Sequence, residues 1–426
     1  MHNTANVYLW KTHIGTVLLT EGNPIAKFQY TDEFLDLGIE VSPINMPLKS
    51  TVFEFPELSI KSFHGLPGLL SDSLPDKFGN KVIAAWLREQ GLGPEDLNTI
   101  DRLCYAGQRG MGALEYKPAL FDKDNTSEIL TVENLSQLAN KVLKMREEAK
   151  STLAPGMNKY SSILKVGSSA GGARAKALIG WNESTGEVRS GQVKLPDGFG
   201  YWLIKFDGLT GNGDKEGDDK WGYGRVEYAY HLMAKAAGID MSECRLWNKR
   251  HFMTRRFDRL NDGNKLHMQT LGALAHFDFN NPTAYSYEQA FRITRQVVNH
   301  AKADEQLFRR MAFNILAWNC DDHVKNIAYL MDRNGKWSLA PAYDECYAYN
   351  PEGDWTSQHQ MSVNGKRIGI TDEDIIAAAS FANIRERKAR AILDEVKDAI
   401  RQWSNFATQA EVRDEFNTTI AKQLKI

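Results

Sequence analysis

Several long runs of the chain carry apolar residues at the spacing of amphipathic helices. In the run 305–318 one face carries Leu307, Met311, Phe313, Ile315, Leu316 and Trp318. Burial of that face would fix where the helix ends. Similar runs predict helices at residues 77–90, 130–150, 226–238, 287–301, 372–381 and 385–403.

Shorter apolar runs bounded by turn residues predict strands, most of them in the first half of the chain. Residues 7–10 and 15–19 flank a hairpin-like link, and polar residues 31–33 start a short helix. Further strands are expected at residues 26–30, 177–181, 201–206, 251–259, 327–331 and 336–340. The last two flank the turn 332–335, so a hairpin should follow the helix 305–318.

Composition indicates a globular protein of two or three folding units. The chain has 426 residues, 42% of them hydrophobic, with ten Trp and a net charge of −2. This balance argues against bulk electrostatic binding to nucleic acid. Four scattered Cys form no Cys-x-x-Cys pair, and neither a signal peptide nor a run of eighteen apolar residues is present. We therefore expect a soluble, cytoplasmic protein that does not enter a membrane.

The eight residues 319–326 concentrate the polar chemistry of the chain directly after a predicted helix. Kinase catalytic loops carry a base Asp five residues before a metal-binding Asn, and a second metal-binding Asp further on. Asp321 precedes Asn326 by five residues and Asp322 precedes it by four, so Asp321 is the predicted base and Asp322 a supporting neighbour. Asn326 and Asp344 would offer Mg²⁺ the hard oxygen ligands that it prefers. The alternative is a solvated loop with a helix-capping Asp.

Lys205 interrupts an otherwise apolar predicted strand, which is costly unless its ammonium meets anions. Kinases use such a lysine on the ATP phosphates and hold it with a helix Glu. Glu227, at the start of the next predicted helix, is the candidate partner. The alternative is a lysine that snorkels at a strand edge.

Two Gly-rich stretches need separate interpretations. Residues 164–176 form a small-residue run whose backbone N–H groups could approach a phosphate, although the run fits neither the P-loop nor the Gly-x-Gly-x-x-Gly pattern. Residues 103–116 are expected to lead into a strand and to serve packing, because they lack the strand–loop–helix context of a nucleotide loop.

The motif Asp321-Asp-His-Val-Lys-Asn326, followed by Pro341-Ala-Tyr-Asp344, resembles the HipA family of serine/threonine kinases. Members of that family are the toxins of bacterial toxin–antitoxin pairs. The family pattern is Asp-x-His-x-Lys-Asn followed by Tyr-Asp. The resemblance extends over roughly residues 5–400, with the motifs in family order.

The resemblance implies a set of ATP-binding residues. They are Gly171, Gly172, Ala173, Arg174, Ala175, Lys176, Lys205, Arg255, Arg256, Phe257, His323, Lys325, Asn326, Tyr343 and Asp344. It also places the autophosphorylated Ser at Ser169, with Ser168 as a rival one position away.

The resemblance further implies an α+β, bilobal, kinase-like fold. The expected parts are an N-terminal subdomain at 1–125, a β-rich lobe with the nucleotide loop at 126–264 and a helical lobe with the catalytic loop at 265–426. ATP and Mg²⁺ are the implied cofactors. A helix-turn-helix antitoxin, operator DNA bound through it, and a translation enzyme such as an aminoacyl-tRNA synthetase are the implied partners.

Two other functions remain open from the sequence. One is a small-molecule kinase of the aminoglycoside-phosphotransferase type, and the other is a catalytically idle corepressor of a DNA-binding antitoxin. The 151–181 stretch argues against the first, and the intact catalytic residues argue against the second.

Overall fold

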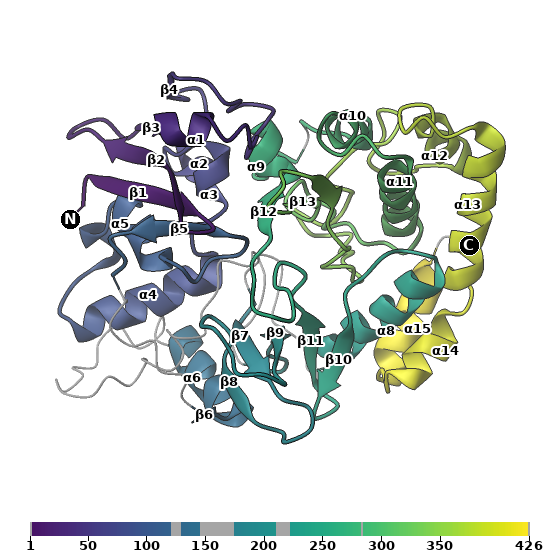
Figure 1. The fold of residues 1–426 in the computed structure, drawn as a ribbon. Helices are drawn as coiled ribbons and strands as arrows, with labels where there is room; N and C mark the ends of the chain where they lie inside the picture. Colours follow the sequence, from purple (N-terminus) through teal and green to yellow (C-terminus); the bar gives the residue numbers. More distant parts are fainter. Residues whose placement is uncertain (1, 121–128, 145–173, 210–221, 283, 425–426) are drawn as a thin grey trace. The chain divides into compact units, whose positions relative to one another are not determined.

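The computed structural model describes residues 2–120, 129–144, 174–209, 222–282 and 284–424. The chain divides into two compact units, each assembled from separate stretches (Figure 1). Unit 1 comprises Met1–Asp219, Met253–Gln269 and Leu330–Gly335, and unit 2 comprises Lys220–Phe252, Thr270–Tyr329 and Lys336–Ile426. The three domain ranges expected from the sequence stay a prediction.

Unit 1 begins with a five-stranded antiparallel sheet in the order β4-β3-β2-β1-β5. Its strands are β1 (Thr4–Leu9), β2 (Thr12–Leu19), β3 (Ala26–Tyr30), β4 (Val52–Phe53) and β5 (Leu114–Lys117). The predicted first hairpin is confirmed, and its link consists of Trp10 and Lys11 alone. Both have positive φ, 50° and 74°, as a two-residue type I′ turn requires.

The helices of unit 1 are α1 (Asp32–Leu35), α2 (Ile60–Phe63), α3 (Gly68–Ser71), α4 (Lys77–Glu89), α5 (Thr99–Ala106), α6 (Val132–Lys144) and the 3₁₀ turn η1 (Pro94–Asp96). The Thr31 side chain caps α1 by accepting from the N–H of Phe34, so the predicted short helix is confirmed. The stretch 103–116 leads into strand β5 as predicted, and its first residues belong to helix α5. Asn98 and Asp101 form a capping box that starts α5, and the helix runs to Ala106.

A second sheet of unit 1 carries the strands expected to hold phosphates. Strands β11 (His251–Arg255), β9 (Gly200–Lys205), β7 (Lys176–Trp181), β8 (Val188–Ser190) and β6 (Ile129–Leu130) follow one another in this order. Antiparallel pairing of β7 with β9 puts Lys176 directly opposite Lys205. The predicted strands at 177–181 and 201–206 are thereby confirmed. Strand β12 (His267–Thr270) follows later in the chain.

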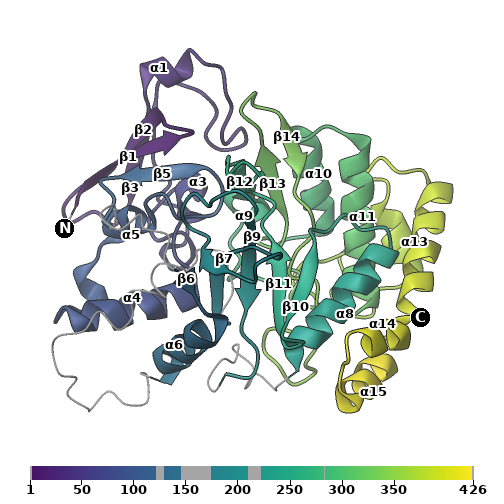
Figure 2. The same ribbon diagram turned by 60° about the horizontal axis from the view of Figure 1, so that its bottom comes forward.

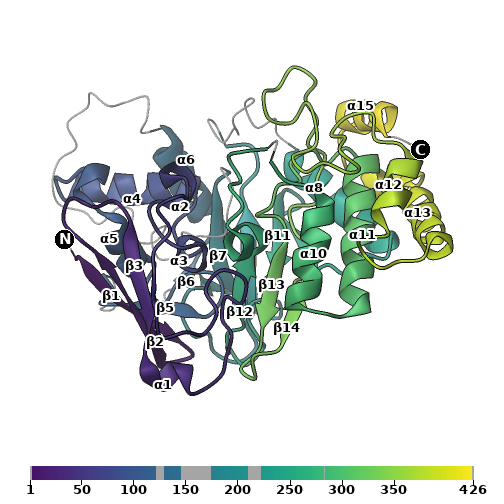
Figure 3. The same ribbon diagram turned by 90° about the horizontal axis from the view of Figure 1, so that it is seen from above.

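Unit 2 is mainly helical. It contains α8 (Tyr223–Ala236), β10 (Cys244–Trp247), α9 (Leu271–Ala275), α10 (Tyr287–Val297), α11 (Ala301–Leu316), α12 (Asp372–Ala378), α13 (Glu386–Ile400), α14 (Trp403–Gln409) and α15 (Asp414–Gln423). Helix α11 lies between α10 and α13, as Figure 2 and Figure 3 show. The predicted hairpin is confirmed as β13 (Ala328–Met331) and β14 (Trp337–Leu339).

Helix α11 is the element that positions the polar loop after it. Five of its six predicted core residues are buried: Leu307, Met311, Phe313, Ile315 and Leu316. Trp318 is the exception, because the helix ends at Leu316 and Trp318 adopts the left-handed conformation with φ of 54°. The chain therefore turns sharply just before residue 319. Among the described helices, none is long and apolar enough to cross a membrane.

Candidate catalytic site

The loop after α11 is fixed by backbone pairing to the segment that follows the hairpin. Asn319 and Ala348 form a parallel bridge. The N–H of Cys320 donates to the carbonyl of Ala348 at 3.0 Å, and the N–H of Ala348 donates to the carbonyl of Trp318 at 3.0 Å. This pairing brings the 319–326 loop and the 343–348 segment together within unit 2, as the motif order predicts.

Asp322 is a structural carboxylate. Its side chain is fully buried, and it accepts hydrogen bonds from the Tyr287 hydroxyl at 2.9 Å and from the N–H of Gln360 at 2.7 Å. The Nδ1 atom of His359 lies 3.2 Å from the same carboxylate. A buried carboxylate engaged by three partners holds loops together and has no open face toward a substrate.

Asp321 lies in a different environment from its neighbour. Its side chain is 32% exposed, and its Oδ1 accepts a hydrogen bond from the indole N–H of Trp355 at 2.8 Å. The Nε2 atom of His323 lies 4.0 Å from the same oxygen. Burial therefore distinguishes the two carboxylates. Only Asp321, the residue that the five-residue spacing selects, can be approached by a second molecule. Its role as the base stays a prediction.

Asn326 is oriented by the loop itself. Its Nδ2 donates to the backbone carbonyl of Asp321 at 2.8 Å, which leaves Oδ1 as the atom that could bind a cation. Asp344 has φ of 56°, a conformation that is uncommon for a non-glycine residue and often occurs at functional sites. The Nδ2 of Asn319 donates to the Asp344 carbonyl at 3.3 Å and so links this residue to the loop.

Asn326 and Asp344 fit Mg²⁺ as partial ligands. Both offer hard oxygen atoms, and Mg²⁺ commonly takes one or two protein oxygens together with water and phosphate. Within the described part of the chain, no group of three or more His, Cys, Asp or Glu side chains is placed to hold a metal ion.

Three further residues of the motif lie around the same loop. The hydroxyl of Tyr343 donates to the Lys325 carbonyl at 2.6 Å and so ties the loop to the end of the hairpin. The ammonium of Lys325 lies 4.7 Å from the ring centroid of Phe279, and the His323 ring meets the same ring edge-on. The Nδ1 atom of His323 is buried and has no hydrogen-bond partner among the described residues.

Glu345 was missed in the sequence. It is buried directly after Asp344, and burial raises its pKa to about 8, with Asp322 and Asp344 nearby adding to the rise and Arg310 and Asn319 opposing it. Asn319 donates to its Oε2 at 3.2 Å. Arg310, a buried cation on helix α11, is the feature of the sequence that could have pointed to the buried Glu345.

Two family profiles match the sequence. The profile of the HipA-like C-terminal domain matches residues 168–404, and that of the HipA N-terminal domain matches residues 5–117. The first match alone spans more than half of the chain.

The chain belongs to the HipA family. Its structure is similar to that of the HipA chain in a complex of HipA, HipB and operator DNA from Shewanella oneidensis MR-1, with a TM-score of 0.67 and 16% sequence identity over 98% of this chain and 94% of that one. The expected α+β, two-lobed HipA fold is thereby confirmed. A Haemophilus influenzae protein named “Putative kinase” is 30% identical over 134 residues, which cover 28% of this chain and 39% of that protein.

The residues assigned to ATP by the HipA resemblance lie partly outside the described residues. Ser168, Ser169, Gly171, Gly172 and Ala173 fall there. Among the others, Arg174 and Ala175 directly precede β7.

Lys176 and Lys205 are brought together as cross-strand neighbours. Lys176 is buried, and its ammonium binds the carboxylate of Asp76 at 2.9 Å. A phosphate could take this ammonium only in competition with Asp76. Lys205 is the last residue of β9, and Glu227 is buried on α8. Their pairing stays a prediction.

Arg255 and Arg256, which the HipA resemblance assigns to ATP, differ from one another in environment. Arg255 donates to the Asn261 side chain at 2.8 Å and is accessible. The guanidinium of Arg256 is buried and binds Asp258 at 2.7 Å, and the two arginines around Asp258 hold the pKa of that carboxyl well below its usual range. Contact between the Arg256 side chain and an adenine base would require this buried network to open. The ATP contacts of Arg255, Arg256 and Phe257 stay predictions.

Proposed function

We propose that this chain is an ATP- and Mg²⁺-dependent serine/threonine protein kinase of the HipA type, which autophosphorylates and acts as the toxin of a toxin–antitoxin pair. One observation carries the proposal. Asp321 is a half-exposed carboxylate oriented by an indole N–H, and its neighbour Asp322 is buried and fully engaged. A kinase needs one reachable base at this position of the motif.

Asp321 would accept the proton of the acceptor hydroxyl and orient that hydroxyl for attack. The Trp355 N–H holds one oxygen of this carboxylate, which would fix its orientation for the reaction in advance. The Asn326 Oδ1 and the Asp344 carboxylate would hold Mg²⁺, which neutralises charge on the phosphates when bound. Lys205 and the residues before β7 would hold the phosphates, and His323 and Lys325 would line the nucleotide pocket.

The partners are proposed from the family. The similar Shewanella structure contains HipB and operator DNA with its HipA. We extend this to a helix-turn-helix antitoxin that would bring the present chain to operator DNA. A translation enzyme such as an aminoacyl-tRNA synthetase is the proposed protein substrate, and the cytoplasm is the proposed compartment.

The deciding experiment is incubation of the pure protein with labelled ATP and Mg²⁺ without an added substrate. We expect label on the wild-type chain and on the control variant Asp354→Asn, which changes an exposed carboxylate of the same loop as Trp355. Asp321→Asn should carry no label. No label on the protein, together with label on an aminoglycoside in a second incubation to which one is added, would favour a small-molecule kinase. No label under any condition would favour a catalytically idle partner of an antitoxin.

A further inference from the structure

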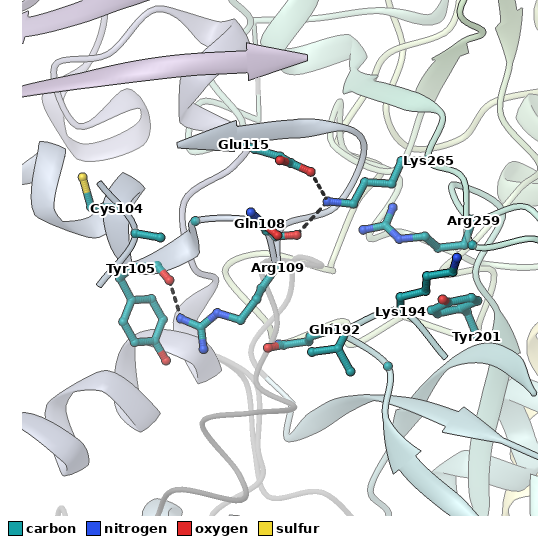
Figure 4. A pocket seen from close by; sticks show the side chains of 15 residues that line it. Cys104, Tyr105, Gln108, Arg109, Glu115, Gln192, Lys194, Tyr201, Arg259 and Lys265 are labelled. Carbon is teal, nitrogen blue, oxygen red and sulfur yellow. Dashed lines mark hydrogen bonds and ion pairs between the residues drawn. The ribbon is translucent and has the colours of Figure 1, made fainter. Parts of the chain in front are cut away.

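Unit 1 contains a cavity of about 310 Å³ that the proposed kinase chemistry does not use (Figure 4). Its walls come from three stretches of the chain, within residues 104–119, 191–201 and 259–265. None of the residues assigned to ATP or to the catalytic loop is among its described lining. The cavity is therefore a separate feature of the fold, built inside one unit.

The side chains that line the cavity are strongly basic. Among its described lining, four side chains are cations, Arg109, Lys194, Arg259 and Lys265, and one is a carboxylate, Glu115. Figure 4 shows Lys194, Arg259 and Lys265 grouped on one side. The ammonium of Lys194 has no hydrogen-bond or ion-pair partner among the described residues. Such a concentration of one charge in a concave site attracts anions.

Two of these cations are held rigidly by neutral groups. The guanidinium of Arg259 donates to the carbonyls of Gly110 at 3.0 Å and Gly112 at 2.9 Å, and Lys265 donates to the carbonyl of Gln108 at 2.8 Å. Carbonyl oxygens satisfy hydrogen bonds without cancelling charge. The donors are thus positioned in advance, and these carbonyls cancel none of their charge.

The carboxylates near these cations are shared. Asp258 binds Arg259 at 2.7 Å, but it also binds Arg256 at 2.7 Å, so one carboxylate serves two guanidinium groups. Glu115 is engaged by Lys265 at 2.9 Å. Burial lowers the pKa of Arg259 to about 10 and also lowers the pKa of Lys265, and neighbouring cations add to both effects. The cations Arg256, Arg259 and Lys265 are held close together although they repel one another. A bound anion would reduce this repulsion.

The remaining walls limit the size of an occupant. Arg109 lies with its guanidinium carbon 4.8 Å from the ring centroid of Tyr105, and the Tyr201 hydroxyl accepts from the N–H of Leu195 at 3.0 Å. Gly263 has φ of 79°, and a Cβ there would lie 3.0 Å from the Tyr201 hydroxyl. A larger residue at this position would therefore displace the Tyr201 side chain. A volume of about 310 Å³ is near the lower end of small-molecule pockets.

We infer that this cavity binds a small phosphate monoester, whose dianionic phosphate meets the cluster of Lys194, Arg259 and Lys265, with Arg109 on the opposite wall. A phosphate offers several acceptor oxygens to lysine and arginine donors and carries about two negative charges near neutral pH. A single carboxylate would bring only one negative charge to these cations. The site adds a binding activity to this chain that does not depend on the proposed phosphotransfer.

The test is calorimetric titration of the full chain with inorganic phosphate, glycerol 3-phosphate and glycerol, in the presence of a saturating non-hydrolysable ATP analogue and Mg²⁺. We expect both phosphates to bind and glycerol not to bind, with affinity falling as salt is raised. Lys194→Gln should weaken binding about fivefold or more, as expected for the loss of one charge close to the ligand, and Arg109→Gln, on the opposite wall, should weaken it less.

Lys61→Gln, which removes an exposed lysine of the same unit away from the cavity, is the matched control and should bind like the wild type. Asp321→Asn should also keep the binding, which separates this site from the kinase proposal. An absence of saturable phosphate binding at about 10 mM would overturn the inference. Equal affinities in Lys194→Gln, Arg109→Gln and the wild type would overturn it as well.

Discussion

Replacing Asp322 and Asp321 separately should give opposite results, although the two carboxylates are adjacent in the chain. Asp322→Ala removes the acceptor of the Tyr287 hydroxyl and the Gln360 N–H, and it removes the contact with His359. Each buried donor left unsatisfied costs about 1–3 kcal/mol. With three such groups we expect a loss of about 3 kcal/mol or more in the free energy of unfolding. For a unit of 150–250 residues this lowers the melting temperature by about 6–12 °C.

Asp321→Asn should leave stability almost unchanged. The carboxamide is of the same size, its Oδ1 can still accept from Trp355, and the position is partly exposed, so a change within about 0.5 kcal/mol is expected. Phosphotransfer should nevertheless fall by about 10²–10⁴, because the base is lost.

Thermal unfolding and autophosphorylation from labelled ATP, measured on both variants and on Asp354→Asn, check the pair together. The reasoning fails if Asp321→Asn keeps near-wild-type turnover while Asp322→Asn is folded and inactive. It also fails if Asp322→Ala melts at the wild-type temperature.

Three further outcomes are expected. Asp344→Gly, which tolerates the positive φ at this position, should weaken ATP binding by calorimetry in the presence of Mg²⁺ much more than in its absence, and equal losses would make Asp344 structural. Mass spectrometry after incubation with ATP and Mg²⁺ should find phosphate on Ser169, and Ser169→Asp should lower ATP affinity through charge repulsion; phosphate found only outside residues 161–176 would contradict this. Burial lowers the pKa of His267 from 6.5 to about 4, so the unfolded chain takes up the proton first and stability should fall between pH 6.5 and 4, by at most about 1.4 kcal/mol per pH unit for this residue. In urea denaturation His267→Gln, which can still donate to the Val41 carbonyl, should show a shallower fall, and an unchanged slope would exclude His267 as a contributor.

Local patterns predicted the frame of the catalytic loop, because helix periodicity and turn residues act over a few positions. Helix α11 and the β13–β14 hairpin were both recognisable in this way. Trp318 was placed on the helix in error, since its apolar side chain fits the period but its backbone turns left-handed after the last helical residue.

The contacts that distinguish Asp321 from Asp322 were not readable from the sequence. Trp355 and His359 come from an irregular segment more than thirty residues further on, and Tyr287 comes from the start of a helix thirty-five residues before. Motif spacing indicated which carboxylate should be the base. Only the packing shows why Asp322 is closed to a second molecule.

The buried pair of Lys176 and Asp76 has a consequence for how the chain can change. The two residues lie a hundred positions apart, yet each is the other's counter-charge in a place without water. Loss of one partner leaves a lone buried charge and costs about 3–5 kcal/mol, whereas a matched apolar replacement of both can be neutral. The loss of thermal stability caused by Asp76→Leu should therefore be partly offset by Lys176→Met, while the loss of the Asp76 cap on helix α4 remains. Natural variants of this chain should therefore either keep both Lys176 and Asp76 or replace both.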